Sequence, residues 1–248
     1  MKQIEICCGS YDDCLQAHRG GAHRVELNSA LHMGGLTPSV GSLHLTKQHT
    51  DLQVMVMIRP RGAGFCYGEA DYQCMLEDAR IFLEEGADGI VFGCLHPDGT
   101  IHEEQTRQMI DLAHQYGKEA VFHRAFDCTP DPFKAIETLI QLKADRILTS
   151  GQQPKAMQGK ELLKQLQERY GNQIELLAGS GMNAENAKEL MDYTGITQVH
   201  SSCKTYYPDT TTAIAQVDYA YLGGEHQASY DGVSSELVKA LVEAVNKV

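Results

Sequence analysis

The chain has 248 residues, of which 42% are hydrophobic and 22% are charged, and its formal net charge is -12. This balance is typical of a globular protein, and no segment approaches the roughly 18 continuous apolar residues of a membrane span. The negative charge repels phosphate backbones and anionic lipids, so neither nucleic acid nor a membrane is expected as a partner. The first residues form a strand-like segment instead of a basic stretch followed by a long apolar one, which favours a cytoplasmic location.

Short apolar, β-branched runs recur along the chain, and each is followed by a small or charged residue and then by a stretch with helical spacing. This alternation is the signature of βα units. Helices are predicted over 71–85, 132–142 and 183–193, and a terminal helix is predicted over about 234–247. The eight predicted strands cover 4–8, 24–27, 54–58, 89–92, 120–123, 146–149, 175–178 and 198–201.

Eight βα units predict an α/β fold, a single (β/α)8 TIM barrel that forms one domain over residues 1–248. A doubly wound open sheet is the alternative, but it normally carries a glycine-rich phosphate loop after its first strand. Here Gly9, Ser10 and Tyr11 follow the first strand instead. The segment 204–230 departs from the repeat, and we interpret it as an extended loop after the eighth strand.

Polar residues gather at the predicted carboxyl ends of the strands, where barrel enzymes place their active sites. We expect Glu26, His123, Asp127 and His200 to carry proton transfer, and Arg59 and Arg61 to hold an anion. Small residues after strands seven and eight are expected to let a phosphate approach the backbone. The full set of candidate substrate-binding residues is Arg59, Arg61, Arg124, Ser150, Gly179, Ser180, Ser201 and Ser202.

Each of these residues also has a structural interpretation. Arg59 could form an ion pair with Glu26, and either His123 or His200 could be a hydrogen-bonded core histidine. The glycines after strand seven also suit an ordinary turn. Five of these groups are costly to desolvate together unless a ligand or an ion-pair network compensates them, which favours a ligand site: Glu26, Arg59, Arg61, His123 and His200.

The eight cysteines include no C-x-x-C pair, so we expect reduced thiols and no structural zinc site. Cys7 and Cys8 are adjacent in a strand and therefore point to opposite faces. If Glu5 faces the barrel interior, Cys7 shares that face. Cys203 follows the eighth strand, next to the first in a closed barrel, so Cys7 and Cys203 are candidate ligands for Cu(I). The alternative is two unrelated thiols.

Seven motifs, in order along the chain, resemble the copper homeostasis CutC family. They are EICC at 5–8, RVEL at 24–27, GGLTPS at 34–39, IRPRG at 58–62, FHRAFD at 122–127, RILTSG at 146–151 and HSS at 200–202. The resemblance implies a cytoplasmic TIM barrel that forms homo-oligomers and binds Cu(I) through cysteines. Members of this family commonly carry a cysteine directly after the Val-Glu-Leu motif, and this chain has Asn28 there.

Three hypotheses follow from the sequence. The resemblance implies a copper-handling protein that binds Cu(I) through Cys7. The strand-end residues indicate an enzyme that acts on a small anionic or phosphorylated metabolite. The third hypothesis is a catalytically idle barrel that serves as an oligomeric binding module.

Overall fold

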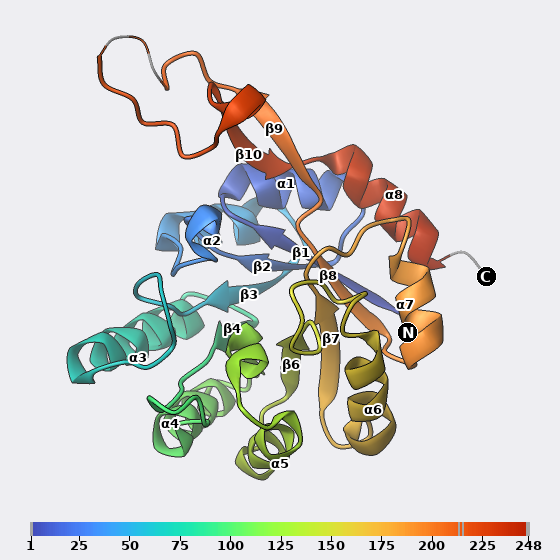
Figure 1. Ribbon diagram of the computed structural model, residues 1–248. Coiled ribbons are helices and arrows are strands. Elements are labelled where there is room, and N and C mark those ends of the chain that lie inside the picture. Colours follow the sequence, from blue (N-terminus) through green and yellow to red (C-terminus); the bar gives the residue numbers. More distant parts are fainter. Residues whose placement is uncertain (1, 213, 215, 247–248) are drawn as a thin grey trace.

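The barrel in this computed structural model, which describes residues 2–212, 214 and 216–246, consists of eight parallel strands closed in sequence order, with β8 next to β1. Every predicted strand is present, with bounds that differ by at most one residue at either end (Figure 1). The strands are β1 Gln3–Cys8, β2 Arg24–Leu27, β3 Gln53–Met57, β4 Gly89–Phe92, β5 Glu119–Phe122, β6 Arg146–Thr149, β7 Glu175–Gly179 and β8 Gln198–Ser201.

Helices surround the barrel and cover the outward faces of its strands (Figure 1). They are α1 Tyr11–Arg19, α2 Val40–His49, α3 Glu69–Glu84, α4 Glu103–Gln115, α5 Pro132–Leu142, α6 Lys160–Tyr170, α7 Ala187–Thr194 and α8 Ser235–Asn246, with short 3-10 helices η1 Leu31–Met33, η2 Arg124–Cys128 and η3 Gly224–His226. The helix predicted over 183–193 starts later, because the Asn183 and Asn186 side chains accept backbone N–H bonds in a turn before it. Lys247, the last residue of the predicted terminal helix, lies outside the described residues. Among those residues, no helix combines the length and apolar character needed to cross a bilayer.

The strand alternation divides apolar side chains between two regions. Ile6 and Cys8 point outward into the main core between strands and helices, as predicted for the first strand. Inside the barrel, a separate apolar cluster fills the side formed by β3, β4 and β5. The opposite side of the interior carries charges. The interior cluster consists of Met55, Met57, Val91 and Val121.

An ion network closes the amino-terminal part of the interior. Glu5 Oε2 lies 2.6 Å from Arg24 Nε and 4.0 Å from Arg146 Nη1, and all three side chains are almost fully buried. Arg146 also contacts Glu119 at 2.6 Å and Glu175 at 3.0 Å. Burial acts to raise the pKa of Glu5, but the charge of Arg24 and a hydrogen bond from His200 lower it to about 2. The carboxylate is therefore ionised in the folded protein.

The extended loop expected over 204–230 is in part an antiparallel ribbon. Its strands are β9 Lys204–Pro208 and β10 Ser229–Val233, which project from the barrel beside α1 (Figure 1). At the base of the ribbon, the Asp13 carboxylate on α1 accepts hydrogen bonds from the backbone N–H groups of Gly9 and Val233, both at 2.8 Å. The strand β9 reads Lys-Thr-Tyr-Tyr-Pro, without the alternation of polar and apolar residues that predicts a strand.

Replacing Glu5 with Gln should destabilise the barrel, since it leaves the buried guanidinium of Arg24 without a carboxylate partner and removes one of the three carboxylates around Arg146. At neutral pH the loss of unfolding free energy should be about 3–5 kcal/mol, measured by urea denaturation. The folded-state pKa lies below the ordinary value of 4.5, so this stabilisation is complete above that pH and is lost as the pH falls toward 2. The difference between wild type and Glu5→Gln should therefore shrink over that range. The control is Glu103→Gln on the exposed first turn of α4. A constant difference over the acid range would contradict the assignment.

Candidate functional site

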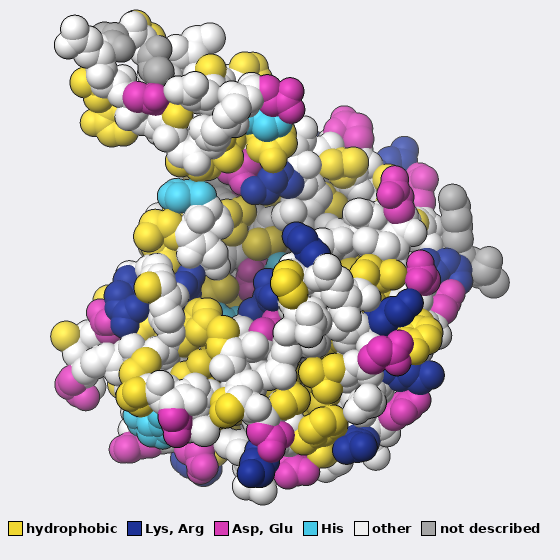
Figure 2. Space-filling model, in the orientation of Figure 1, with side chains coloured by type: hydrophobic (Ala, Val, Ile, Leu, Met, Phe, Trp, Pro, Cys, Tyr) yellow, Lys and Arg dark blue, Asp and Glu magenta, His cyan; other side chains and the backbone are white. Residues whose placement is uncertain are grey.

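A pocket of about 550 Å³ opens at the carboxyl ends of the strands. The face shown in Figure 2 is hollowed there, with acidic, basic and histidine side chains around the hollow. Its walls come from β1, β2, β3, β6 and β8 and from the segments that follow β2, β3, β5, β6, β7 and β8. The lining residues are Cys7, Glu26, Leu31, Gly34, Met57, Arg59, Phe65, His123, Arg124, Leu148, Lys155, Ser180, Gly181, His200, Ser202 and Lys204.

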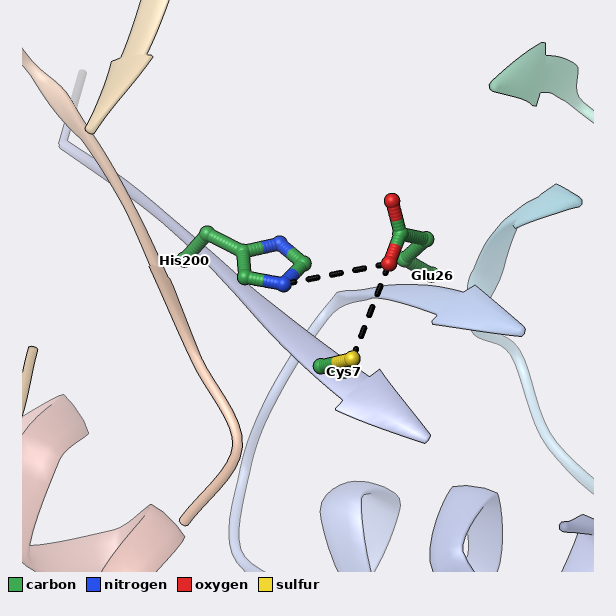
Figure 3. Close-up of side chains that lie close together, drawn as sticks. All are labelled: Cys7, Glu26 and His200. Atoms are coloured by element: carbon green, nitrogen blue, oxygen red, sulfur yellow. Dashed lines mark hydrogen bonds and ion pairs between the residues drawn. The ribbon is translucent and has the colours of Figure 1, made fainter. Parts of the chain in front are cut away.

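Three potential ligand groups converge at the floor of this pocket. The thiol of Cys7, the carboxylate of Glu26 and the imidazole of His200 each offer an atom, and these atoms lie within 4.8 Å of one another. Glu26 Oε2 is 3.6 Å from Cys7 Sγ and 3.8 Å from His200 Nε2. Figure 3 shows the three side chains pointing toward one another from adjacent strands. The pairing of β1 with both β2 and β8 brings them together.

Burial and the charges of neighbouring groups shift the pKa values of all three members of this trio. Desolvation, the nearby carboxylate of Glu26 and its hydrogen bond raise the pKa of the Cys7 thiol well above its usual range. Desolvation and the charge of Glu5 raise the pKa of Glu26. Burial alone would lower the pKa of His200, but Glu26 and Glu5 raise it above the ordinary value of 6.5. The trio therefore retains protons that a bound cation could displace.

Glu5 fixes the orientation of His200. The Nδ1 atom of His200 lies 2.9 Å from Glu5 Oε1, so Nδ1 donates to that ionised carboxylate. The Nε2 atom faces Glu26 and the pocket. A histidine that donates one ring N–H to a carboxylate and presents the other nitrogen is the arrangement found around metal-ligating histidines.

His123, just after β5, lies in the wall of the same pocket. Its Nδ1 accepts a hydrogen bond from the Ala125 N–H at 3.0 Å, and its buried Nε2 has no partner among the described residues. Burial, followed by the charges of Arg59 and Arg124, lowers the pKa of His123 to about 3. His123 is therefore a neutral imidazole with an uncommitted nitrogen.

The structure separates the two arginines that were expected to clamp an anion. Arg59 lines the pocket, but its guanidinium donates to the carbonyls of Met33, Gly35 and Ala63. Arg59 also forms no ion pair with Glu26, which was the structural interpretation of this residue. Arg61 lies outside the lining residues and forms an ion pair with Asp71 at 2.7 Å. Both guanidiniums hold loops in place, and no local sequence pattern indicates these carbonyl contacts.

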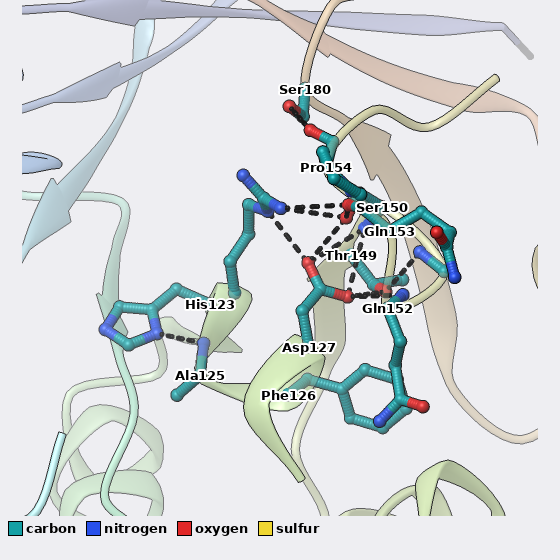
Figure 4. A network of polar contacts seen from close by, with 12 residues as sticks. His123, Ala125, Phe126, Asp127, Thr149, Ser150, Gln152, Gln153, Pro154 and Ser180 are labelled. Atoms are coloured by element: carbon teal, nitrogen blue, oxygen red, sulfur yellow. Dashed lines mark hydrogen bonds and ion pairs between the residues drawn. The ribbon is translucent and has the colours of Figure 1, made fainter. Parts of the chain in front are cut away.

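Asp127 also has a positioning role. It accepts hydrogen bonds from the Thr149 hydroxyl at 2.6 Å and from the hydroxyl and backbone N–H of Ser150 (Figure 4). Arg124 Nε lies 2.8 Å from the same carboxylate, and Arg124 Nη2 donates to Ser150 at 2.8 Å. Asp127 and Ser150 thus join the loops after β5 and β6, while Arg124 reaches the pocket.

The small residues after β7 and β8 allow close packing. A Cβ at Gly179 would lie 2.6 Å from Leu148 Cδ1, so a larger residue there would require the Leu148 side chain to move. Ser180 lines the pocket and donates to the Pro154 carbonyl at 2.7 Å, and Ser202 also lines it. Ser201 is buried and donates to the Met182 carbonyl.

Cys203 is not a member of the trio. It lines a neighbouring pocket beside Met182 and Asn183, and its sulfur lies 3.5 Å from the Ser201 hydroxyl. The backbone turns at Cys203 in the left-handed region, with φ at 40°, so the chain leaves the direction of β8 there. The position of Cys203 after β8 predicts a place near β1, but no local sequence pattern indicates this turn.

The structure places at the site polar residues that were not expected there, among them Asn28 and Lys155. Asn28 Nδ2 donates to Glu26 Oε2 at 2.9 Å and lies 3.6 Å from Cys7 Sγ. Lys155 reaches the pocket from the loop after β6. Asn28 could have been found as the polar residue directly after the Glu26 strand, whereas Lys155 lies in a loop without any sequence periodicity.

The fold and the site define a (β/α)8 barrel protein with a titratable ligand pocket at the carboxyl ends of its strands. The CutC family profile matches residues 2–205. The chain belongs to the CutC family. CutC family proteins from Treponema denticola and Vibrio campbellii are 48% identical over 198 residues, covering 80% of each chain, and 37% identical over 244 residues, covering 98% of this chain and 99% of the other.

Solved structures agree with this assignment. A protein from Streptococcus agalactiae named as a copper homeostasis protein, CutC, is 33% identical, with a TM-score of 0.77, and covers 82% of this chain and 99% of its own. A phosphoribosyl anthranilate isomerase from Thermococcus kodakaraensis is 14% identical, with a TM-score of 0.58 over the whole of both chains. That second likeness shows the barrel fold alone.

Replacing Glu26 with Gln should lower the pKa of His200, because the substitution removes the largest charge that holds the imidazolium form. Nitrogen NMR of histidine-labelled protein across a pH titration measures this pKa. Glu189→Gln, on the exposed side of α7, is the matched control and should leave it unchanged. An unaltered His200 titration in Glu26→Gln would show that the two groups are not coupled.

Proposed function

We propose that this protein binds Cu(I) at Cys7 and His200, with Glu26 beside them, and that it acts in copper homeostasis. The observation that carries the proposal is the convergence of a thiol, an imidazole nitrogen and a carboxylate within 4.8 Å at the floor of an open pocket. The S. agalactiae relative named for copper homeostasis supports the same role.

The chemistry of the donors fits a soft ion that carries one positive charge. Thiolate and imidazole are ligands that copper favours, and coordination removes the thiol proton. Glu26 Oε2 already accepts from the Cys7 thiol, so it lies where a displaced proton can pass. Glu26 Oε1 is buried and has no hydrogen-bond partner among the described residues, which leaves it free to face a cation.

The cellular setting belongs to the same proposal. A cytoplasmic location fits the cysteines, all eight of which are free thiols, as a reducing compartment maintains them. The resemblance to the family also implies a homo-oligomer, whose mass light scattering would measure.

The Cys7→Ser variant should lose stoichiometric Cu(I) uptake, because a hydroxyl is a poor ligand for a soft ion. Uptake is measured by competition with a colorimetric Cu(I) chelator under reducing conditions. Cys74→Ser, at an exposed position on α3, and Cys203→Ser, in the neighbouring pocket, should leave uptake unchanged. If Cys7→Ser takes up as much Cu(I) as wild type, the site is not the one proposed.

Replacing Asn28 with Cys should strengthen Cu(I) binding. The Asn28 amide lies 3.6 Å from the Cys7 sulfur, so a thiol at this position would supply a second soft ligand. We expect a gain of at least about tenfold in affinity from the second thiolate, measured by the same competition. Asn28→Ser, which adds no thiol, is the control. Equal affinities for the Cys and Ser variants would exclude Cys7 from the coordination sphere.

A further inference from the structure

The pocket extends well beyond the three residues at its floor. A single ion does not fill about 550 Å³, a volume within the range of about 300–1,000 Å³ that small-molecule sites occupy. Its remaining walls carry His123, Arg124 and Lys155, none of which belongs to the trio. These three side chains decide what else the pocket can hold.

His123 is a fixed hydrogen-bond donor. Its Nδ1 accepts the Ala125 N–H, so the ring proton of the neutral imidazole resides on Nε2. The residue is 4% exposed and Nε2 is buried, yet this N–H has no acceptor among the described residues. A buried donor without a partner is unfavourable because it has lost its hydration, and a ligand oxygen at this point would remove that cost.

The imidazole ring is held in place from two sides. A Cβ on Gly93 would lie 2.5 Å from His123 Cε1, so the absence of a side chain there lets the ring approach the β4 backbone. The Phe65 ring lies on His123 with a centroid separation of 4.8 Å, and Arg59 covers Phe65 at 5.0 Å. The donor direction of Nε2 is therefore set before any ligand binds.

Lys155 supplies an uncompensated positive charge. Lys155 is exposed, and its Nζ forms no ion pair or hydrogen bond among the described residues. The backbone around it is fixed, because the Ser180 hydroxyl donates to the Pro154 carbonyl (Figure 4). The Ser180 carbonyl in turn accepts the Ala156 N–H at 3.0 Å. Its aliphatic stem crosses Gly181, where a Cβ would lie 2.7 Å away. The ammonium is thus attached to a rigid wall.

Arg124 adds a second cation with spare donor capacity. Its Nε and Nη2 contact Asp127 and Ser150, and Nη1 has no partner within the part of the chain that the structure describes. Asp127 neutralises part of the guanidinium charge, so Lys155 is the stronger electrostatic contact for an anion.

We propose that this pocket binds a small organic anion whose anionic group contacts Lys155 and Arg124 and whose carbonyl or carboxylate oxygen accepts the Nε2–H of His123. The anion site is independent of copper, because it uses none of the three groups at the floor. A neutral imidazole can donate a hydrogen bond to an oxygen that carries partial or full negative charge. The imidazole keeps its proton in this interaction.

The test uses 2-phosphoglycolate as the probe, with inorganic phosphate as the minimal anion, and calorimetry on the full chain freed of metal by a chelator. Wild type should bind 2-phosphoglycolate with a Kd below about 1 mM and bind phosphate at least about tenfold more weakly, since phosphate cannot span both contacts. His123→Ala and Lys155→Gln should each weaken 2-phosphoglycolate binding at least about tenfold.

Two matched variants separate this proposal from the copper proposal and from general charge effects. Cys7→Ser should lose Cu(I) and keep 2-phosphoglycolate affinity within about twofold. Lys134→Gln removes the same charge from an 83% exposed position outside the pocket and should leave binding unchanged. If wild type shows no saturable binding, or if both pocket variants bind like wild type, the anion site is excluded whatever the outcome for copper.

A measurement on wild type keeps the proposal falsifiable if His123→Ala does not fold. In nitrogen NMR of histidine-labelled protein, His123 should show the Nε2-protonated tautomer, and 2-phosphoglycolate should shift its Nε2 resonance in a saturable way. A His123 signal that does not move at saturating probe would overturn the proposal.

Discussion

The structure depends on the pairing of charges inside the barrel, above all on Glu5. A carboxylate and two guanidiniums in a buried layer are tolerated only when each satisfies the others. Arg24 and Arg146 enter from β2 and β6, on opposite sides of the interior, and both approach Glu5 on β1. This contact ties distant strands together across the barrel. Apolar packing of the methionine and valine side chains fills the other side. The barrel interior therefore has a charged region and an apolar region.

The same carboxylate links the fold to the pocket. One oxygen of Glu5 faces Arg24, and the other receives the Nδ1–H of His200. A residue that the barrel needs for stability therefore also sets the direction of the His200 nitrogen that faces Cys7 and Glu26. Any change at Glu5 alters stability and ligand geometry together. Stability measurements must accompany every binding measurement on variants of this layer.

The sequence predicted the eight strands and the pocket that they form, because β-branched runs and glycine turns are local signals and strand ends of a parallel barrel meet at one face. It also placed Cys7 on the inner face. It did not predict the carbonyl contacts of Arg59 and Arg61 or the position of Lys155. Nor did it predict the hydrogen bonds by which Asp127 joins the loops after β5 and β6. Those depend on loop paths that bring distant residues together, which no local pattern encodes. The β9–β10 ribbon shows no clear alternation of polar and apolar residues, and a strand pair joined by a long connection also lacks the short-turn signal that marks a hairpin.

The ribbon has a consequence for how the pocket can change. The family profile ends at residue 205, at the start of β9, and all eight barrel strands pair with one another without the ribbon. Lys204, the first residue of β9, nevertheless lines the pocket and forms an ion pair with Asp231 on β10. The ribbon can therefore vary in length or composition without breaking a single barrel hydrogen bond, while it changes the charge at one rim of the pocket. Ligand preference can diverge within this architecture at little cost to folding.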